Sequence, residues 1–197
     1  FTASIINGII GSLVGGISGY YGGKVDLLIQ RIVDVLYGIP SMIITLLLMV
    51  VLGNGVHCLI IAMICVGWIG SCRTVRGEVL KLRESDFVAA AKIMGVKDIV
   101  IIVKHILPNV MGLMIPRMTM ANPNAIFQEA LVSYIGLEIS PPDCSGGVLA
   151  KEGNQMLRVY PYQVFVPAFM SCTTMLALNL LGDGLRDAFD PKLRGTE

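Results

Sequence analysis

The sequence predicts an all-α membrane protein, a bundle of helices that crosses the bilayer several times. Of its 197 residues, 54% are hydrophobic and only 15% are charged, whereas soluble domains carry about 25% charged residues. The mean hydropathy is +0.73. The charges also cluster, and the stretches between them approach the ~20 apolar residues that one helix needs to cross a bilayer. The formal net charge of +1 gives no sign of a nucleic-acid partner, and we expect none.

Uncharged stretches predict the first three spans. The first is Phe1 to Gly23, and we expect a short polar connection to follow it, with Lys24, Asp26, Arg31 and Asp34. Val35 to Cys72 then runs for 38 residues without a formal charge, which is too long for one span. Its one good turn, Gly53-Asn54-Gly55, predicts spans over Val35 to Leu52 and Val56 to Ser71.

Two further spans follow. His105 to Glu138 holds the fourth, with Arg117 inside it and Glu129 near one end, and Pro116 and Pro123 should bend or break that helix. Val159 to Gly182 is the fifth. The chain opens inside an apolar stretch without an initiator Met, so we interpret it as a fragment and expect one more span upstream.

Glycines at a four-residue spacing mark one face of the first span. Gly11, Gly15 and Gly19 leave little side chain on that face. Small residues at this spacing let two helices approach closely in lipid. We therefore expect these three glycines to form a helix-packing surface.

The distribution of Lys and Arg predicts the orientation. The segment from Arg73 to Lys104 holds seven basic residues, so the positive-inside rule makes it cytoplasmic. The charged tail 183–197 then lies on the same side. The Gly53-Asn54-Gly55 turn and the polar loop 138–158 lie outside.

The cytoplasmic segment looks ordered. Ser85 is a plausible N-cap, and Asp86 favours the first turn of a helix. Phe87, Ala90, Ala91 and Met94 share one face of it, and Gly95 fits a stop. A second helix, Ile99 to Leu107, would be capped by Asp98 and bounded by Pro108. Periodicity alone leaves two interpretations equal: insertion into a partner's groove, or an amphipathic helix on the lipid surface.

Three stretches carry a family resemblance that covers essentially the whole chain. They are Asp86-Phe87-Val88-Ala89-Ala90-Ala91-Lys92-Ile93-Met94-Gly95 with His105-Ile106-Leu107-Pro108-Asn109, then Glu129-Ala130-Leu131-Val132-Ser133-Tyr134-Ile135-Gly136-Leu137 with Pro141-Pro142, and Asn179-Leu180-Leu181-Gly182-Asp183-Gly184-Leu185-Arg186-Asp187 with Asp190-Pro191-Lys192-Leu193-Arg194. The first resembles the cytoplasmic loop signature of ATP-binding-cassette importer permeases. The other two resemble the dipeptide, oligopeptide and nickel branch of that family. Ser145-Gly146-Gly147 stands where the family usually has Trp-Gly, and Glu138 where a small residue is usual.

The resemblance implies a single transmembrane permease domain over 1–197 in a bacterial inner membrane. Its partners would be a second permease subunit, cytoplasmic ATPase subunits that hold ATP and Mg, and an extracytoplasmic substrate-binding protein. The region 73–107 would couple the spans to the ATPase through Asp86, Phe87, Ala89, Ala90, Met94, Gly95 and His105. The solute would be a peptide, with nickel chelates or another small solute as the alternative.

Other functional classes have less support. Gly23-Lys24 is the one Gly-Lys pair, Ser18 stands where a P-loop needs its first Gly, and Val25 where it needs Ser or Thr. We therefore expect no ATP site, no cofactor and no catalytic residue on this chain. A channel or secondary transporter would rely on Arg117 and Glu129 as intramembrane functional groups. The five cysteines show no metal-ligand spacing, and we interpret them as small apolar fillers.

Overall fold

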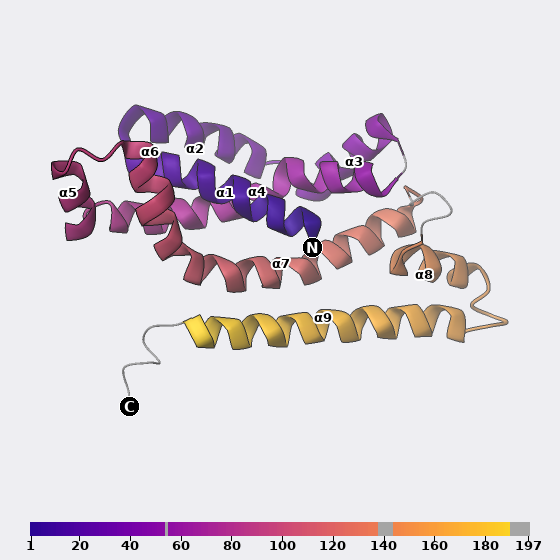
Figure 1. Ribbon diagram of the computed structural model, residues 1–197. Coiled ribbons are helices and arrows are strands. Elements are labelled where there is room, and N and C mark those ends of the chain that lie inside the picture. The colour runs from indigo at the N-terminus through magenta and orange to yellow at the C-terminus, as the bar shows by residue number, and fades with distance from the viewer. Residues whose placement is uncertain (54, 138–143, 190–197) are drawn as a thin grey trace.

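The protein is a bundle of helices. The computed structural model describes residues 1–53, 55–137 and 144–189, and within these ranges it contains no strand (Figure 1). The elements are α1 (Thr2–Tyr21), α2 (Gly23–Tyr37), α3 (Ser41–Leu52), α4 (Val56–Leu82), α5 (Asp86–Ile93), α6 (Asp98–Val100), the π-helical turn η1 (Ile101–Ile106), α7 (Leu107–Ile135), α8 (Gly146–Gln155) and α9 (Tyr162–Phe189). The predicted all-α fold is confirmed.

Four helical stretches of the described chain are long and apolar enough to cross a membrane. They are Thr2–Tyr21, Val56–Leu82, Asp98–Ile135 and Tyr162–Phe189. A fifth crossing results if α2 and α3 together form one span, because the pair passes the same test but is bent by 80°. The predicted first, third, fourth and fifth spans therefore each correspond to one of these stretches.

The second span differs from the prediction. The expected polar connection is the helix α2, and the expected helix from Val35 to Leu52 is broken after Tyr37. Gly38 and Pro40 explain the break, because proline lacks an amide hydrogen and disfavours helical geometry in the residue before it. The 12 residues of α3 rise about 18 Å, well short of a ~30 Å hydrocarbon core.

Charged residues of α2 pair with arginines of α4. Arg76 makes two hydrogen bonds to Asp26, of 2.5 and 2.6 Å, and Arg73 contacts Asp34 at 2.5 Å. The Arg73 guanidinium also lies 4.1 Å from the ring centroid of Tyr37. The helix of the third span continues past Ser71, the predicted end of that span, to Leu82. The carboxylates of α2 neutralise the first two basic residues of this extension.

The fourth span is not broken by its prolines. Pro116 and Pro123 both lie inside α7, which follows a curved path beside α9 (Figure 1). Pro123 cannot donate to the carbonyl of Thr119, and the Asn122 side chain donates to that carbonyl instead, at 3.2 Å. A neighbouring side chain thus satisfies the backbone group that the proline leaves free.

The predicted polar loop 138–158 contains the helix α8. Ser145 caps it by accepting a hydrogen bond from the Val148 amide at 3.3 Å. The loop prediction missed this helix because glycines dominate its first residues, yet a Cβ at Gly147 would meet the Ala130 Cα at 2.6 Å. Gly147 therefore permits close packing of α8 on α7. Glu138, Pro141 and Pro142 lie outside the described residues.

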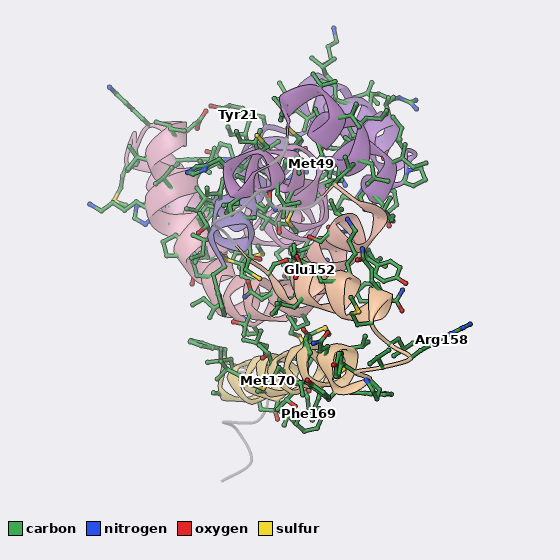
Figure 2. The ribbon with its side chains drawn as sticks, turned by 90° about the vertical axis from the view of Figure 1, so that its right-hand side faces the viewer. Tyr21, Met49, Glu152, Arg158, Phe169 and Met170 are labelled. Carbon is green, nitrogen blue, oxygen red and sulfur yellow. The ribbon has the colours of Figure 1, made fainter. Side chains whose placement is uncertain are left out.

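The last helix, α9, runs past the predicted limit at Gly182 and ends at Phe189. Of its most apolar 18-residue window, only 6% is buried. Phe169 and Met170 lie on its outer side (Figure 2) and are 70% and 64% exposed. Such a surface suits contact with lipid or with another membrane helix.

The tightest packing in the bundle is between α1 and α4. A Cβ built at Gly11 would lie 2.7 Å from the carbonyl oxygen of Trp68, and one at Gly19 would lie 2.9 Å from that of Arg76. A Cβ at Gly15 would overlap the carbonyl oxygen of Cys72. The three glycines thus face the backbone of α4 over two turns of α1, and a larger side chain has no room there.

We predict that Gly15→Leu destabilises the bundle by about 1–3 kcal/mol, the usual cost of overpacking. Gly77→Leu is the matched control, because no atom lies within 4 Å of a Cβ at Gly77. Thermal unfolding of the purified protein in detergent should show a lower midpoint for Gly15→Leu only. Equal midpoints for the two variants would contradict a close contact at Gly15.

Candidate functional site

The helix α5 lies at one end of the bundle, opposite the end that carries α8 (Figure 1). It follows α4 after a short turn and begins with Asp86. Ser85 occupies the predicted N-cap position. Its hydroxyl, however, donates to the Leu82 carbonyl at 2.5 Å and makes no capping hydrogen bond to α5. The turn thus uses this side chain to close the end of α4.

One side of α5 is buried against the bundle. Val88 and Ala91 are 0% and 3% exposed and belong to a core cluster with Val79, Ile101 and Ile102. The prediction had placed Ala91 on the same free face as Phe87, Ala90 and Met94. The structure corrects this: Ala91 faces inward, because α5 packs on α4 and η1 through Val88 and Ala91.

The residues on the other side of α5 are exposed to solvent, Phe87 only in part. Phe87, Ala89, Ala90 and Met94 are exposed, Phe87 to 40% and Met94 to 73%. Ile93 is the most exposed of all, at 87%. Sequence reasoning missed Ile93, although its place three residues after Ala90 puts the two on one side of a helix. Exposed apolar residues gathered on one short helix mark an interaction surface.

The end of α5 is a Schellman motif. Gly95 has φ +74°, its amide donates to the Lys92 carbonyl at 3.0 Å, and the Val96 amide donates to the Ala91 carbonyl at 3.1 Å. This pair of bonds needs a left-handed residue at the position of Gly95. The predicted stop at Gly95 therefore has a clear backbone cause.

A polar contact fixes the start of the next helix. The Tyr20 hydroxyl, at the end of α1, donates to an Asp98 carboxylate oxygen at 2.7 Å. The Lys92 ammonium lies 4.9 Å from the centroid of the same tyrosine ring. Tyr20 is only 7% exposed, so this contact joins α1, α5 and α6 from inside. No periodicity pointed to Tyr20, because its partners lie more than seventy residues away.

The second helix of the segment does not stop at Pro108. Lys97 occupies its N-cap position, Asp98 is its first residue, and the helix continues through η1 into α7. Our prediction of a separate helix from Ile99 to Leu107 is therefore wrong. The π-helical geometry of η1 widens the turn just before the Pro108 ring, which would crowd a regular α-helix.

The remaining predicted residues lie apart from α5. His105 belongs to η1 and is half-buried, and its carbonyl accepts a hydrogen bond from the Asn109 side chain at 2.6 Å. Arg117 and Glu129 lie twelve residues apart on α7, which is about 18 Å along the helix. Glu129 accepts a hydrogen bond from Ser133 at 2.7 Å. The two groups do not form a pair.

Nothing in the described part of the chain has the form of a metal centre, since no group of three or more His, Cys, Asp or Glu side chains gathers there. The notable features are instead a helix with a free apolar face at one end of the bundle, and polar side chains at membrane depth.

The family match and the similar known proteins all indicate the same family of transport proteins. Residues 11–195 match the family described as binding-protein-dependent transport system inner membrane component. The oligopeptide transport system permease protein OppC of Bacillus subtilis is 45% identical over 98% of this chain and 63% of its own length. The dipeptide transport system permease protein DppC of the same species is 45% identical over 98% of this chain and 60% of its length. The glutathione transport system permease protein GsiD of Escherichia coli is 37% identical over 98% of this chain and 64% of its length.

The chain spans about three fifths of the length of these relatives. The match to the family profile nevertheless extends over nearly all of its residues, and the helices supply the several apolar spans that an inner membrane component needs. This chain belongs to the family of binding-protein-dependent transport system inner membrane components and is a multi-pass bacterial membrane protein.

Proposed function

We propose that this chain is the permease subunit of an ATP-driven importer of peptides. Two such subunits would enclose the solute pathway, and an extracytoplasmic binding protein would deliver the solute. Cytoplasmic ATPase subunits, which would carry ATP and Mg, would drive the cycle. The relatives named as oligopeptide, dipeptide and glutathione permeases support a peptide rather than a nickel chelate as the solute.

The observation that carries this proposal is the two-sided packing of α5. Its outer face offers Phe87, Ala90 and Ile93 to a partner, while Val88 and Ala91 hold it to the bundle. Small alanines between larger apolar residues suit a helix that enters a groove. We assign α5 as the helix that docks in the ATPase subunit, with Asp86, Ala89 and Met94 beside the contact.

The packing contacts of α5 also suggest how a movement of the ATPase would be transmitted to the membrane-spanning helices. Val88 packs against Ile101 and Ile102, which continue directly into α7. Tyr20 and Asp98 join the same region to α1. A displacement of α5 by the ATPase would therefore move α1, α4 and α7 together, as expected for rigid-body switching between inward-open and outward-open states.

A lipid-surface position for α5 remains the competing interpretation, and one substitution pair separates the two. Ala90→Asp and Ile93→Asp place a carboxylate on the outer face without touching the bundle. Since an unpaired charge in an apolar groove costs several kcal/mol, we predict that each lowers ATPase retention and peptide uptake by at least about tenfold.

The measurement is pull-down of the ATPase with uptake assayed in parallel. Lys97→Asn is the charge-matched control, because it also lowers the net charge by one, Lys97 is exposed, and asparagine is favourable at the N-cap position that Lys97 occupies. Normal ATPase retention and uptake in both α5 variants would show that α5 does not dock there.

A second prediction concerns the stop of α5. Gly95→Val should reduce uptake strongly, because a β-branched residue resists φ +74°. Gly95→Asn should keep most of the activity, since asparagine tolerates the left-handed region. Equal uptake by the two variants, at equal amounts of protein in the membrane, would mean that the turn geometry is not needed.

A third prediction concerns orientation, with α5 in the cytoplasm and the Cys144 end outside. Cys144 is exposed and should react with a membrane-impermeant thiol reagent added to intact cells. Met94→Cys should react only after the membrane is opened. Cys72 is unsuitable as the inner reporter because it is buried. The reverse pattern of labelling would overturn the orientation.

A further inference from the structure

A pocket of about 230 Å³ lies where α1, α4 and α7 meet the beginning of α3, and it is open to the surface, where Ser41 and Asn124 are exposed. We call this pocket the cavity. Its lining holds six polar residues and no charged one; the polar residues are Ser4, Asn7, Ser41, Ser71, Asn124 and Gln128. Alanines, methionines, a valine and a glycine complete the wall. At about 30 Å³ per molecule, such a volume holds about seven waters or a short stretch of an extended solute.

One polar group beside the cavity has unused hydrogen-bonding capacity, and the nearby Ser4, which is 7% exposed, contributes to the same lining. The Asn7 side chain donates to the Met63 carbonyl at 3.4 Å, but its Oδ1 is buried without a donor. Leaving a buried polar group unsatisfied costs about 1–3 kcal/mol. The six polar residues of the lining offer hydroxyl and carboxamide groups to a hydrogen-bonding occupant.

Polar residues continue beyond the cavity along one face of α7. Arg117, Ala121, Asn124 and Gln128 follow one another at intervals of four, three and four residues, so they share one face. Arg117, Ala121 and Asn124 are exposed. We call these four residues the α7 strip. It occupies the middle of the 29-residue helix α7, where exposure to hydrocarbon would be most unfavourable.

The break between α2 and α3 opens toward this region. Ser41, the first residue of α3, lines the cavity and accepts a hydrogen bond from Gln128 at 3.4 Å. The first amides of a helix have no intrahelical acceptor. The Ile43 and Ile44 amides already donate to the Pro40 carbonyl, at 2.9 and 3.4 Å, so the donors left for a solute at this end of α3 are the amides of Ser41 and Met42.

We propose that the α7 strip and the cavity form this subunit's wall of the solute pathway, and that they bind main-chain amides of an extended peptide. Amides carry one donor and one acceptor each and no charge, which matches the hydroxyl and carboxamide groups of the cavity lining. Arg117, the one charged residue of the α7 strip, lies outside that lining. The proposal rests on the proposed import function and adds the residues that contact the solute.

Thiol chemistry in the assembled transporter tests this assignment. The starting protein keeps the buried Cys72 and has alanine at the four other cysteines, which are Cys58, Cys65, Cys144 and Cys172. Asn124→Cys and Gln128→Cys then place a thiol on the strip. Phe127→Cys is the control, because Phe127 is 55% exposed on the same helix but lies outside the cavity lining.

Thiols react as thiolates, which form in water and not in hydrocarbon. In membrane vesicles, we expect the two strip thiols to react with a small hydrophilic methanethiosulfonate at least about tenfold faster than the Phe127→Cys thiol. Trialanine, supplied with the binding protein, should slow labelling of the strip thiols at least about threefold and leave the control unchanged.

The outcomes separate the two proposals. Strip thiols that react no faster than the control would show that lipid or a packed protein segment covers the strip, and this would overturn the pathway assignment even if the starting protein imports trialanine. Fast labelling without protection by trialanine would overturn the peptide as ligand. Failure of the starting complex to import any peptide would count against the proposed function, while the labelling rates would still decide whether the strip faces water.

Discussion

The close approach of α1 to α4 determines where the other elements of this bundle can lie. Gly11, Gly15 and Gly19 remove the side chains that would hold the two backbones apart. Polar bonds extend from this contact: Tyr20 at the end of α1 donates to Asp98, and Ser18 donates at 2.5 Å to Asp26, which also accepts from Arg76 of α4. In lipid, where no hydrophobic force drives helices together, such contact depends on dispersion and on polar bonds.

Much of the architecture could be predicted from the sequence, because lipid imposes a length and a polarity that are visible in composition. The spans α1, α4, α7 and α9 follow from apolar stretches, and the stop at Gly95 follows from the need for a left-handed residue. The pairing of Arg73 and Arg76 with Asp34 and Asp26 could not be predicted, because no local pattern joins residues 39 and 50 positions apart.

The candidate site on α5 could also be predicted only in part from the sequence. Helical periodicity placed Phe87, Ala90 and Met94 on one side of α5, but it could not tell which side faces the protein. The inward position of Ala91 and the exposure of Ile93 depend on where Ile101 and Ile102 pack, which is a tertiary fact. The cavity could not be predicted from the sequence either, because the residues that line it, such as Ser4, Ser41 and Gln128, come from three separate stretches of the chain.

The broken second span also bears on how the protein enters the membrane during synthesis. A helix with Asp26, Arg31 and Asp34, followed by twelve apolar residues, is a poor substrate for insertion by itself. Its carboxylates find their cationic partners only on α4, which leaves the ribosome later. We therefore expect α2, α3 and α4 to partition into the bilayer as one cooperative unit. The ion pairs between α2 and α4 would then have to form during insertion, before the rest of the bundle packs.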